Sequence, residues 1–243
     1  MTDFFNAYED RKMAEAYAKL EFPGTYYLAF RDLPEIIAKH ATGKRALDFG
    51  CGAGRSTRFV ERLGFATTGV DIAESMLALA RQIDPAGDYR LIGDDGFQSF
   101  ASGAFDLILA AFTFDNIPKR AQKIGILREI KRMLAPTGRF INLVSAPEIY
   151  WYEWASFSTK DFPENRSAKC GEIVKIINTD IADGRPVDDI IWPDADYREL
   201  FAEVGLEVEA KYNPLARAED PFEWVNETQI APWSIYVLKV AQS

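Results

Sequence analysis

Apolar positions along this chain follow two alternating patterns, one typical of buried strands and one typical of amphipathic helices. Short, nearly continuous apolar runs indicate strands that are buried on both faces, as in a parallel sheet. Stretches with apolar residues three and four positions apart lie between these runs and indicate helices that cover such a sheet. In chain order, the pattern predicts strand 46–50, helix 55–63, strand 66–70, a helix start after residue 71, and strands 89–92 and 105–111, followed by helix 120–134 and strand 139–145. This alternation predicts an α/β fold.

The two ends of the chain depart from this alternation. Residues 1–40 predict two helices, the second spanning residues 25–40. Residues 147–191 read as an inserted lid, in which segments 172–180 and 187–192 pair as strands. The chain then closes with helix 197–204, strand 206–210 and strand 233–240.

Three glycines spaced two apart follow the first predicted strand. Gly50, Gly52 and Gly54 come directly after Asp48 and open the next helix. A turn without side chains lets a ligand lie against bare backbone and the helix N-terminus. Asp71 ends the next strand, where a carboxylate can accept the hydroxyl protons of a ribose. The segment therefore predicts a nucleoside-containing ligand, with a ligand-free tight turn as the alternative.

The spacing of the glycines separates two classes of nucleoside ligand. A dinucleotide fingerprint requires a small residue where this chain has Arg55. The match fails at that position, which argues against an oxidoreductase that uses a nicotinamide dinucleotide. That enzyme class stays as the rival hypothesis.

The glycine segment resembles motif I of the class I S-adenosylmethionine-dependent methyltransferases, of the type that modifies small molecules. The resemblance covers residues 46–145 and rests on four segments in the family's order: Asp48-x-Gly50-x-Gly52-x-Gly54, Asp71 to Ala80, Phe105-Asp106-Leu107-Ile108, and Leu134-Ala135-Pro136-x-Gly138. It implies a Rossmann-like, doubly wound sheet of seven strands, mostly parallel with an antiparallel last strand. Residues 1–243 would form a single methyltransferase domain, with 1–40 as an N-terminal helical cap and 147–191 as the inserted lid.

The resemblance also implies S-adenosylmethionine as the cofactor. Asp48 would lie near its amino-acid end, Asp71 would bind the ribose, and Asp94 would accept from the adenine amino group. For Asp71, a helix cap is the alternative. The complete set of expected cofactor contacts is Tyr17, Asp48, Gly50, Cys51, Gly52, Asp71, Ile72, Met76, Asp94, Asp95 and Ala111.

Aromatic side chains near the carboxyl edge of the sheet are the expected substrate contacts, because aromatics often line apolar pockets. They are Tyr26, Phe114, Tyr150, Trp151 and Trp154. Packing of the lid and the helices onto the sheet is the alternative role for these side chains.

Methyl transfer from a sulfonium mainly requires alignment, and a base is needed only when the acceptor must lose a proton. Many family members place histidine after the fourth strand, where this chain has Asp115 and Asn116. Asp115 is the candidate catalytic residue, and capping of the next helix is its alternative role.

The composition and net charge of the chain limit the classes of partner that we expect it to bind. The chain has 243 residues, 48% of them hydrophobic, which suits one α/β domain. Its formal charge of −9, with dispersed basic residues, argues against nucleic acid and anionic membranes as partners. The one histidine, His40, falls at a predicted helix end, so no histidine-based metal site is expected.

The cysteine content and the hydropathy of the chain indicate the cellular compartment in which we expect the protein. Two cysteines do not make a disulfide framework and fit a reducing cytoplasm. No secretory signal pattern is recognised, and no apolar run approaches the ~18 residues that a membrane-spanning helix requires. We therefore expect a cytoplasmic methyltransferase of small molecules. A non-catalytic protein that binds S-adenosylmethionine is the second alternative, and no oligomeric state is predicted.

Overall fold

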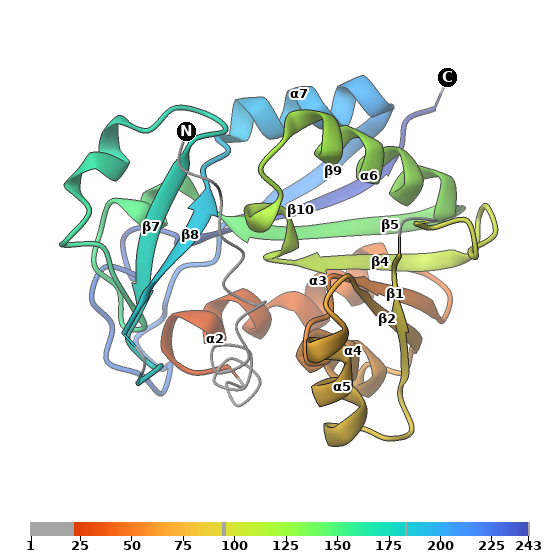
Figure 1. Cartoon of the computed structure of the whole chain (residues 1–243), viewed down its shortest axis with the longest axis horizontal. Helices are drawn as coiled ribbons and strands as arrows, with labels where there is room; N and C mark the ends of the chain where they lie inside the picture. Colours follow the sequence, from red (N-terminus) through yellow and green to blue (C-terminus); the bar gives the residue numbers. More distant parts are fainter. Residues whose placement is uncertain (1–21, 94–95, 183, 243) are drawn as a thin grey trace.

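A seven-stranded sheet forms the centre of the molecule (Figure 1). The computed structural model describes residues 22–93, 96–182 and 184–242. The strands lie in the order β3–β2–β1–β4–β5–β10–β9. Their bounds are β1 Arg45–Phe49, β2 Ala66–Asp71, β3 Asp88–Leu91, β4 Phe105–Ala111, β5 Leu134–Ser145, β9 Leu206–Tyr212 and β10 Trp233–Val240. Strands β1 to β5 pair in parallel, and β10 is antiparallel to both β5 and β9. The predicted fold class is confirmed.

Helices cover both faces of this sheet (Figure 1). One face carries α2 (Gly24–Arg31), α3 (Leu33–His40), α4 (Arg55–Arg62) and α5 (Glu74–Ile83), and the other carries α6 (Arg120–Met133) and α7 (Asp194–Val204). Among the residues that the structure describes, no helix combines the length and apolar character needed to cross a membrane.

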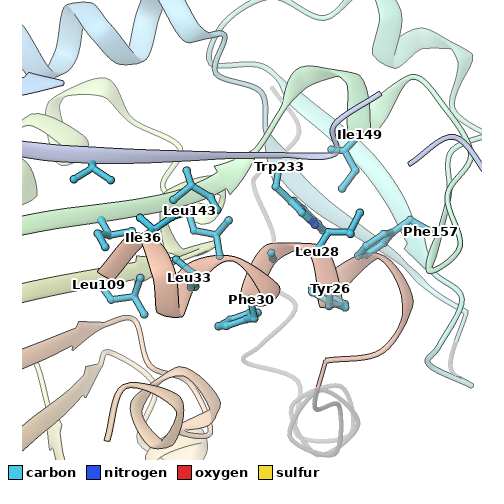
Figure 2. Close-up of a cluster of buried hydrophobic side chains, with 14 of the residues drawn as sticks. Tyr26, Leu28, Phe30, Leu33, Ile36, Leu109, Leu143, Ile149, Phe157 and Trp233 are labelled. Carbon is cyan, nitrogen blue, oxygen red and sulfur yellow. The ribbon is translucent and has the colours of Figure 1, made fainter. Parts of the chain in front are cut away.

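The core divides into two layers because side chains alternate along each strand. On β4, Leu107 and Leu109 belong to the layer beneath α2 and α3, whereas Ile108 belongs to the layer beneath α6 and α7. Figure 2 shows Leu109 and Leu143 with side chains of α2 and α3. Both layers are fully buried at these positions, which explains the continuous apolar run of β4.

The predicted helix over residues 25–40 is wrong, because the chain forms two helices there. α2 ends at Arg31 and α3 begins at Leu33. Pro34 lies in the first turn of α3, where its missing N–H costs nothing. In one continuous helix the same ring would collide with the preceding turn. At the end of α3, His40 contacts Glu209 and the Tyr212 hydroxyl, which is a structural role.

The predicted strand 139–145 begins earlier than expected. Helix α6 ends at Met133, and Leu134 already pairs with Phe105 of β4. The register between the two strands shifts after that pair, which accommodates Pro136 within β5. The breaker residues at 136–138 therefore mark an irregularity in a strand and not a loop.

Residues 147–191, which we call the lid segment, form a second, three-stranded sheet. It contains β6 (Phe157–Ser158), β7 (Ile173–Asn178) and β8 (Pro186–Ile190), all antiparallel, together with the 3-10 helices η3 (Pro147–Tyr150) and η4 (Pro163–Ser167). The predicted pairing of 172–180 with 187–192 is confirmed, and β6 is an additional strand. In Figure 1, β7 and β8 stand beyond the arrowheads of β4 and β5.

Buried hydrogen bonds join the lid segment to α2 and to the loop before β10. The Thr25 amide donates to Ser156 Oγ, and the Ser156 amide donates to Thr25 Oγ1, each at 3.0 Å. Thr25 Oγ1 donates in turn to Glu227 Oε1 at 2.8 Å. Ala155 also donates its amide to that carboxylate, and all of Glu227 is buried. We call Thr25, Ser156 and Glu227 the clasp.

Candidate functional site

A cavity of about 270 Å³ lies at the carboxyl ends of the parallel strands. Residues at the ends of β1, β2 and β4 line it, together with side chains from α2, the lid segment and β10. The chain runs outward from β1 through β2 to β3 and in the opposite direction from β4 to β5. The cavity therefore spans the point where the strand order reverses, which is where open α/β sheets bind ligands.

The glycine turn forms one wall of this cavity. Gly50 and Gly52 line it, and Gly50 has a φ of +73°. A Cβ atom on Gly50 would collide with the side chain of Thr113, whose hydroxyl donates to the Phe49 carbonyl at 2.8 Å. Position 50 thus requires glycine both for its backbone conformation and for the close approach of the segment after β4.

The backbone N–H groups of the turn are bound by the protein itself. Gly50 and Cys51 both donate to the Val70 carbonyl, at 2.8 and 3.0 Å. Gly52 donates to Asp71 Oδ2 at 2.8 Å. A pyrophosphate at such a turn would need backbone N–H groups directed at its oxygens. The arrangement therefore disfavours a dinucleotide, in agreement with the failed spacing at Arg55.

Asp48 lies beneath the turn and does not line the cavity. Its side chain is fully buried, and Oδ2 accepts hydrogen bonds from Ser56 Oγ and Thr57 Oγ1, each at 2.7 Å. Within the described part of the chain, Oδ1 has no hydrogen-bond partner. Burial raises the pKa of Asp48 to about 6, although the two hydroxyl bonds oppose that rise. Asp48 therefore fixes the glycine turn to the start of α4.

Asp71 lines the cavity at the end of β2, next to the glycine turn. Oδ2 accepts from Gly52, and Oδ1 accepts from the amide of Ala73 at 2.9 Å, just before α5. Burial raises the pKa of Asp71, while these backbone bonds lower it. The carboxylate thus supports the start of α5 and also lines the cavity. Next to it, 69% of the Ile72 side chain is exposed, so an apolar surface is open at the rim.

Four aromatic side chains form the far end of the cavity. Tyr26, Phe112, Phe157 and Trp233 all line it, with ring centroids 4.7 Å apart for Phe112 and Trp233 and 5.1 Å apart for Tyr26 and Phe157. Figure 2 shows Tyr26, Phe157 and Trp233 close to one another. They come from α2, the segment after β4, β6 and β10, so only Tyr26 was predicted.

Phe112 is held in an unusual backbone conformation. Its φ of +63° is the one positive value at a non-glycine position among the described residues. Its amide donates to the Leu143 carbonyl at 2.8 Å, which fixes the backbone beside β5. Such a conformation costs on the order of 1–3 kcal/mol and is found mainly at functional sites.

The buried Asp115, the half-buried Asp189 and the buried Lys123 lie behind the aromatic end. Asp115, in the 3-10 helix η2 (Thr113–Asn116), accepts from the Ser145 amide at 3.0 Å. Asp189 on β8 accepts from the Tyr150 hydroxyl at 3.1 Å, and both carboxyl groups line the cavity. Lys123 of α6 is fully buried, and its ammonium donates to the Phe114 carbonyl. Helix α6 begins at Arg120, so Asp115 does not cap it.

Burial is the main cause of the pKa shifts of these three groups. It raises the pKa of Asp115 to about 6 and that of Asp189 to about 8, and the charge on Asp115 adds to the rise at Asp189. The same burial lowers the pKa of Lys123 to about 7. Burial and the charge on Asp115 therefore favour the protonated form of Asp189.

Arg55 lines the cavity beside the glycine turn. Its guanidinium lies over the rings of Tyr26, Phe22 and Phe30, with centroid distances of 5.0, 5.4 and 5.5 Å. Among the described lining residues, it is the one basic side chain. In the sequence, Arg55 served only to reject the dinucleotide spacing.

The structure brings together most of the residues expected to bind the cofactor. Those that line the cavity are Gly50, Cys51, Gly52, Asp71, Ile72, Met76 and Ala111. Tyr17, Asp94 and Asp95 lie outside the described residues.

The residues expected to contact substrate are more dispersed. Tyr26 lines the cavity, whereas Phe114 is fully buried in the layer beneath α6 and α7. Tyr150 lies behind Asp189, to which its hydroxyl donates. Trp151 and Trp154 donate their indole N–H groups to carbonyls of Asn165 and Ile149 within the lid segment and do not line the cavity.

We expect Asp189→Asn to change how stability depends on pH. The native state retains a proton on Asp189 that the unfolded chain releases, so wild-type stability falls relative to the variant as pH rises from about 4 to about 8. Asp115, Asp188, Lys123 and Tyr150, whose charges or hydrogen bonds act on the pKa of Asp189, are present in both proteins. Urea unfolding at several pH values measures the difference in the free energy of unfolding. A difference that stays constant over this range would contradict the assignment.

Comparison with known proteins finds a family match over the parallel strands of the central sheet. Residues 47–142 match the family described as methyltransferase domain. A ubiquinone biosynthesis O-methyltransferase of Nitrosococcus oceani is 31% identical over 126 residues, which are 49% of this chain and 52% of that protein. The chain thus spans about half the length of the first relatives that it matches.

Other similarities extend over more of the chain. An N-demethylindolmycin N-methyltransferase of Streptomyces griseus is 26% identical over 210 residues, covering 85% of this chain and 87% of that protein. The solved structure of the CcbJ methyltransferase from Streptomyces caelestis superposes with a TM-score of 0.67 at 17% identity, covering 98% of this chain and 99% of that chain. The resemblance identified in the sequence is confirmed.

Proposed function

We propose that this protein, which carries a class I S-adenosylmethionine-dependent methyltransferase domain, transfers a methyl group from that cofactor to a small molecule. The observation that carries the proposal is the pairing of Asp71 with the glycine turn beside the point where the strand order reverses. The names of the relatives support a small-molecule acceptor, since they refer to ubiquinone biosynthesis and to N-demethylindolmycin.

The cavity offers a suitable contact for each end of the cofactor. Asp71 would accept from the ribose hydroxyls, while Ile72 and Met76 flank the adenine at the exposed rim. Arg55, beside the glycine turn, would bind the carboxylate at the amino-acid end. Tyr17, Asp94 and Asp95 remain proposed cofactor contacts from the resemblance alone.

The residues around the aromatic end would position the acceptor and exclude water. When bound, S-adenosylmethionine supplies a methyl group activated by a sulfonium. Phe157 of the lid segment and Trp233 of β10 shield the end of the cavity beyond Gly50. The Asp115 carboxylate would be the group that takes a proton from the acceptor. These side chains account for alignment, desolvation and proton removal.

The remaining proposals concern the whole chain. Residues 1–243 would form one methyltransferase domain with the lid segment as its insertion. Cys51 and Cys170 are both free thiols, which fits a reducing cytoplasm. The net charge of −9 supports a small-molecule partner over nucleic acid.

Isothermal titration calorimetry tests the cofactor. We expect S-adenosylmethionine and its demethylated product, S-adenosylhomocysteine, to bind with micromolar dissociation constants, and we expect no heat of binding with NAD. A methyl-transfer screen over small amines, phenols and acids then tests turnover. Binding of NAD in place of the two adenosyl ligands would overturn the proposal, and cofactor binding without any turnover would favour the non-catalytic alternative.

A further inference from the structure

Two carboxyl groups from distant parts of the chain meet at one end of the cavity. Asp189 and Val187 face the cavity from β8, and the strand alternation turns Asp188 to the other side. The amide of Ser145, at the end of β5, donates to Asp115. Ser145 also pairs with Trp233, the first residue of the neighbouring strand β10. The carboxyl pair therefore lies beside the aromatic end and not beside Asp71.

The charges around this pair do not balance. The Tyr150 hydroxyl donates to Asp189, and the Ser145 amide donates to Asp115. The nearest buried cation, Lys123, donates to the carbonyl of Phe114 and packs over the rings of Trp192 and Tyr197. One lysine thus faces two carboxyl groups, so full ionisation of the pair leaves an excess negative charge. Buried charges are costly unless a partner of opposite charge accompanies them.

The walls between the pair and the glycine turn are aromatic. Phe112, Phe157 and Trp233 present apolar rings, and ring faces also attract cations. A substrate carboxylate or phosphate in this position would face the Asp115 carboxylate and be repelled. A protonated amine instead supplies the missing positive charge while its carbon skeleton packs on the rings.

We infer that the methyl acceptor is a small apolar amine, received as an ammonium by Asp115 and Asp189 and methylated on nitrogen. The inference rests on the proposed function of the same cavity and specifies its substrate class. Because burial favours the protonated form of Asp189 in the empty site, we expect binding of the ammonium to displace a proton to solvent.

The carboxyl pair also serves the transfer step. An ammonium has no lone pair, so one N–H proton must first pass to a carboxylate of the pair. The nitrogen lone pair then forms the new N–C bond as the C–S bond of the cofactor breaks, and the bonding electrons remain on sulfur. The products are a methylated ammonium and a neutral thioether, so charge and atoms balance.

Matched ligands test the inference. We would titrate two sets of ligands into protein saturated with S-adenosylhomocysteine. The aromatic set is 2-phenylethylamine, 2-phenylethanol and phenylacetate, and the aliphatic set is hexylamine, hexanol and hexanoate. We expect an amine of the panel to bind at least about tenfold more tightly than its alcohol, and neither acid to bind. Titration in two buffers of different ionisation enthalpy should show proton release with the amine.

Two variants test whether Asp189 is the residue that binds the amine. Asp189→Asn should weaken amine binding by at least about tenfold, abolish the proton release and leave alcohol binding unchanged. Asp188→Asn, on the opposite side of β8, should behave as wild type. Retained binding of S-adenosylhomocysteine shows that each variant is folded.

The outcomes separate this inference from the proposed function. If S-adenosylhomocysteine binds but no amine binds, or alcohols and acids bind as tightly as amines, the inference is overturned while the proposed function stands. Equal loss of amine binding in both variants would also overturn it. If wild type does not bind S-adenosylhomocysteine, the proposed function itself fails.

Discussion

Asp71→Ala is expected to weaken binding of S-adenosylhomocysteine by about 100-fold, because each hydrogen bond to a charged group contributes about 1.5–3 kcal/mol. The substitution removes the acceptor proposed for the ribose and also frees the amides of Gly52 and Ala73. Calorimetry measures the affinity, and unfolding in urea reports the accompanying loss of stability.

Asp88→Ala is the matched control for this variant. Asp88 begins β3, pairs with Arg90 on the surface and does not line the cavity. Its removal should leave the affinity unchanged. An Asp71→Ala protein that binds as tightly as this control would exclude the ribose contact.

Gly50→Ala is expected to lower the free energy of unfolding by about 3 kcal/mol and to remove cofactor binding. The substitution forces a side chain into the left-handed region and onto Thr113. Backbone strain and overpacking each cost about 1–3 kcal/mol. Urea unfolding gives the stability, and calorimetry gives the binding.

Gly125→Ala makes the same chemical change as Gly50→Ala, but we expect it to have the opposite effect on the free energy of unfolding. Gly125 lies in the middle of α6, is exposed, and has open space where its Cβ would be. Alanine there should raise the free energy of unfolding by about 0.5–1 kcal/mol, since glycine is a poor helix former. Equal effects at positions 50 and 125 would refute the role assigned to Thr113 and the turn.

The sequence predicted those parts of the fold that local patterns encode. The apolar run of β4 and the glycine turn each depend on neighbouring residues, and both are found where expected. The helix break before Pro34 was missed because apolar spacing continues across it, although the proline itself was a visible signal. The early start of β5 depends on pairing with Phe105 and could not be read locally.

The acceptor end of the cavity was mostly invisible in the sequence. Phe112, Asp189 and Trp233 are far apart along the chain and meet only through the sheet order and the lid segment. Phe114 was expected there, but the turn after β4 directs it into the opposite core layer. Phe112 adopts the left-handed conformation and lines the cavity, whereas Phe114, two residues later, lies in the opposite core layer.

The clasp makes α2, the lid segment and the loop before β10 mechanically interdependent. Glu227 accepts hydrogen bonds from both Thr25 and Ala155, so displacing either segment removes a hydrogen bond from a fully buried carboxylate. Fluctuations that widen the aromatic end must therefore move all three segments in concert. We therefore expect small molecules to enter at the rim beside Asp71, where Ile72 is exposed.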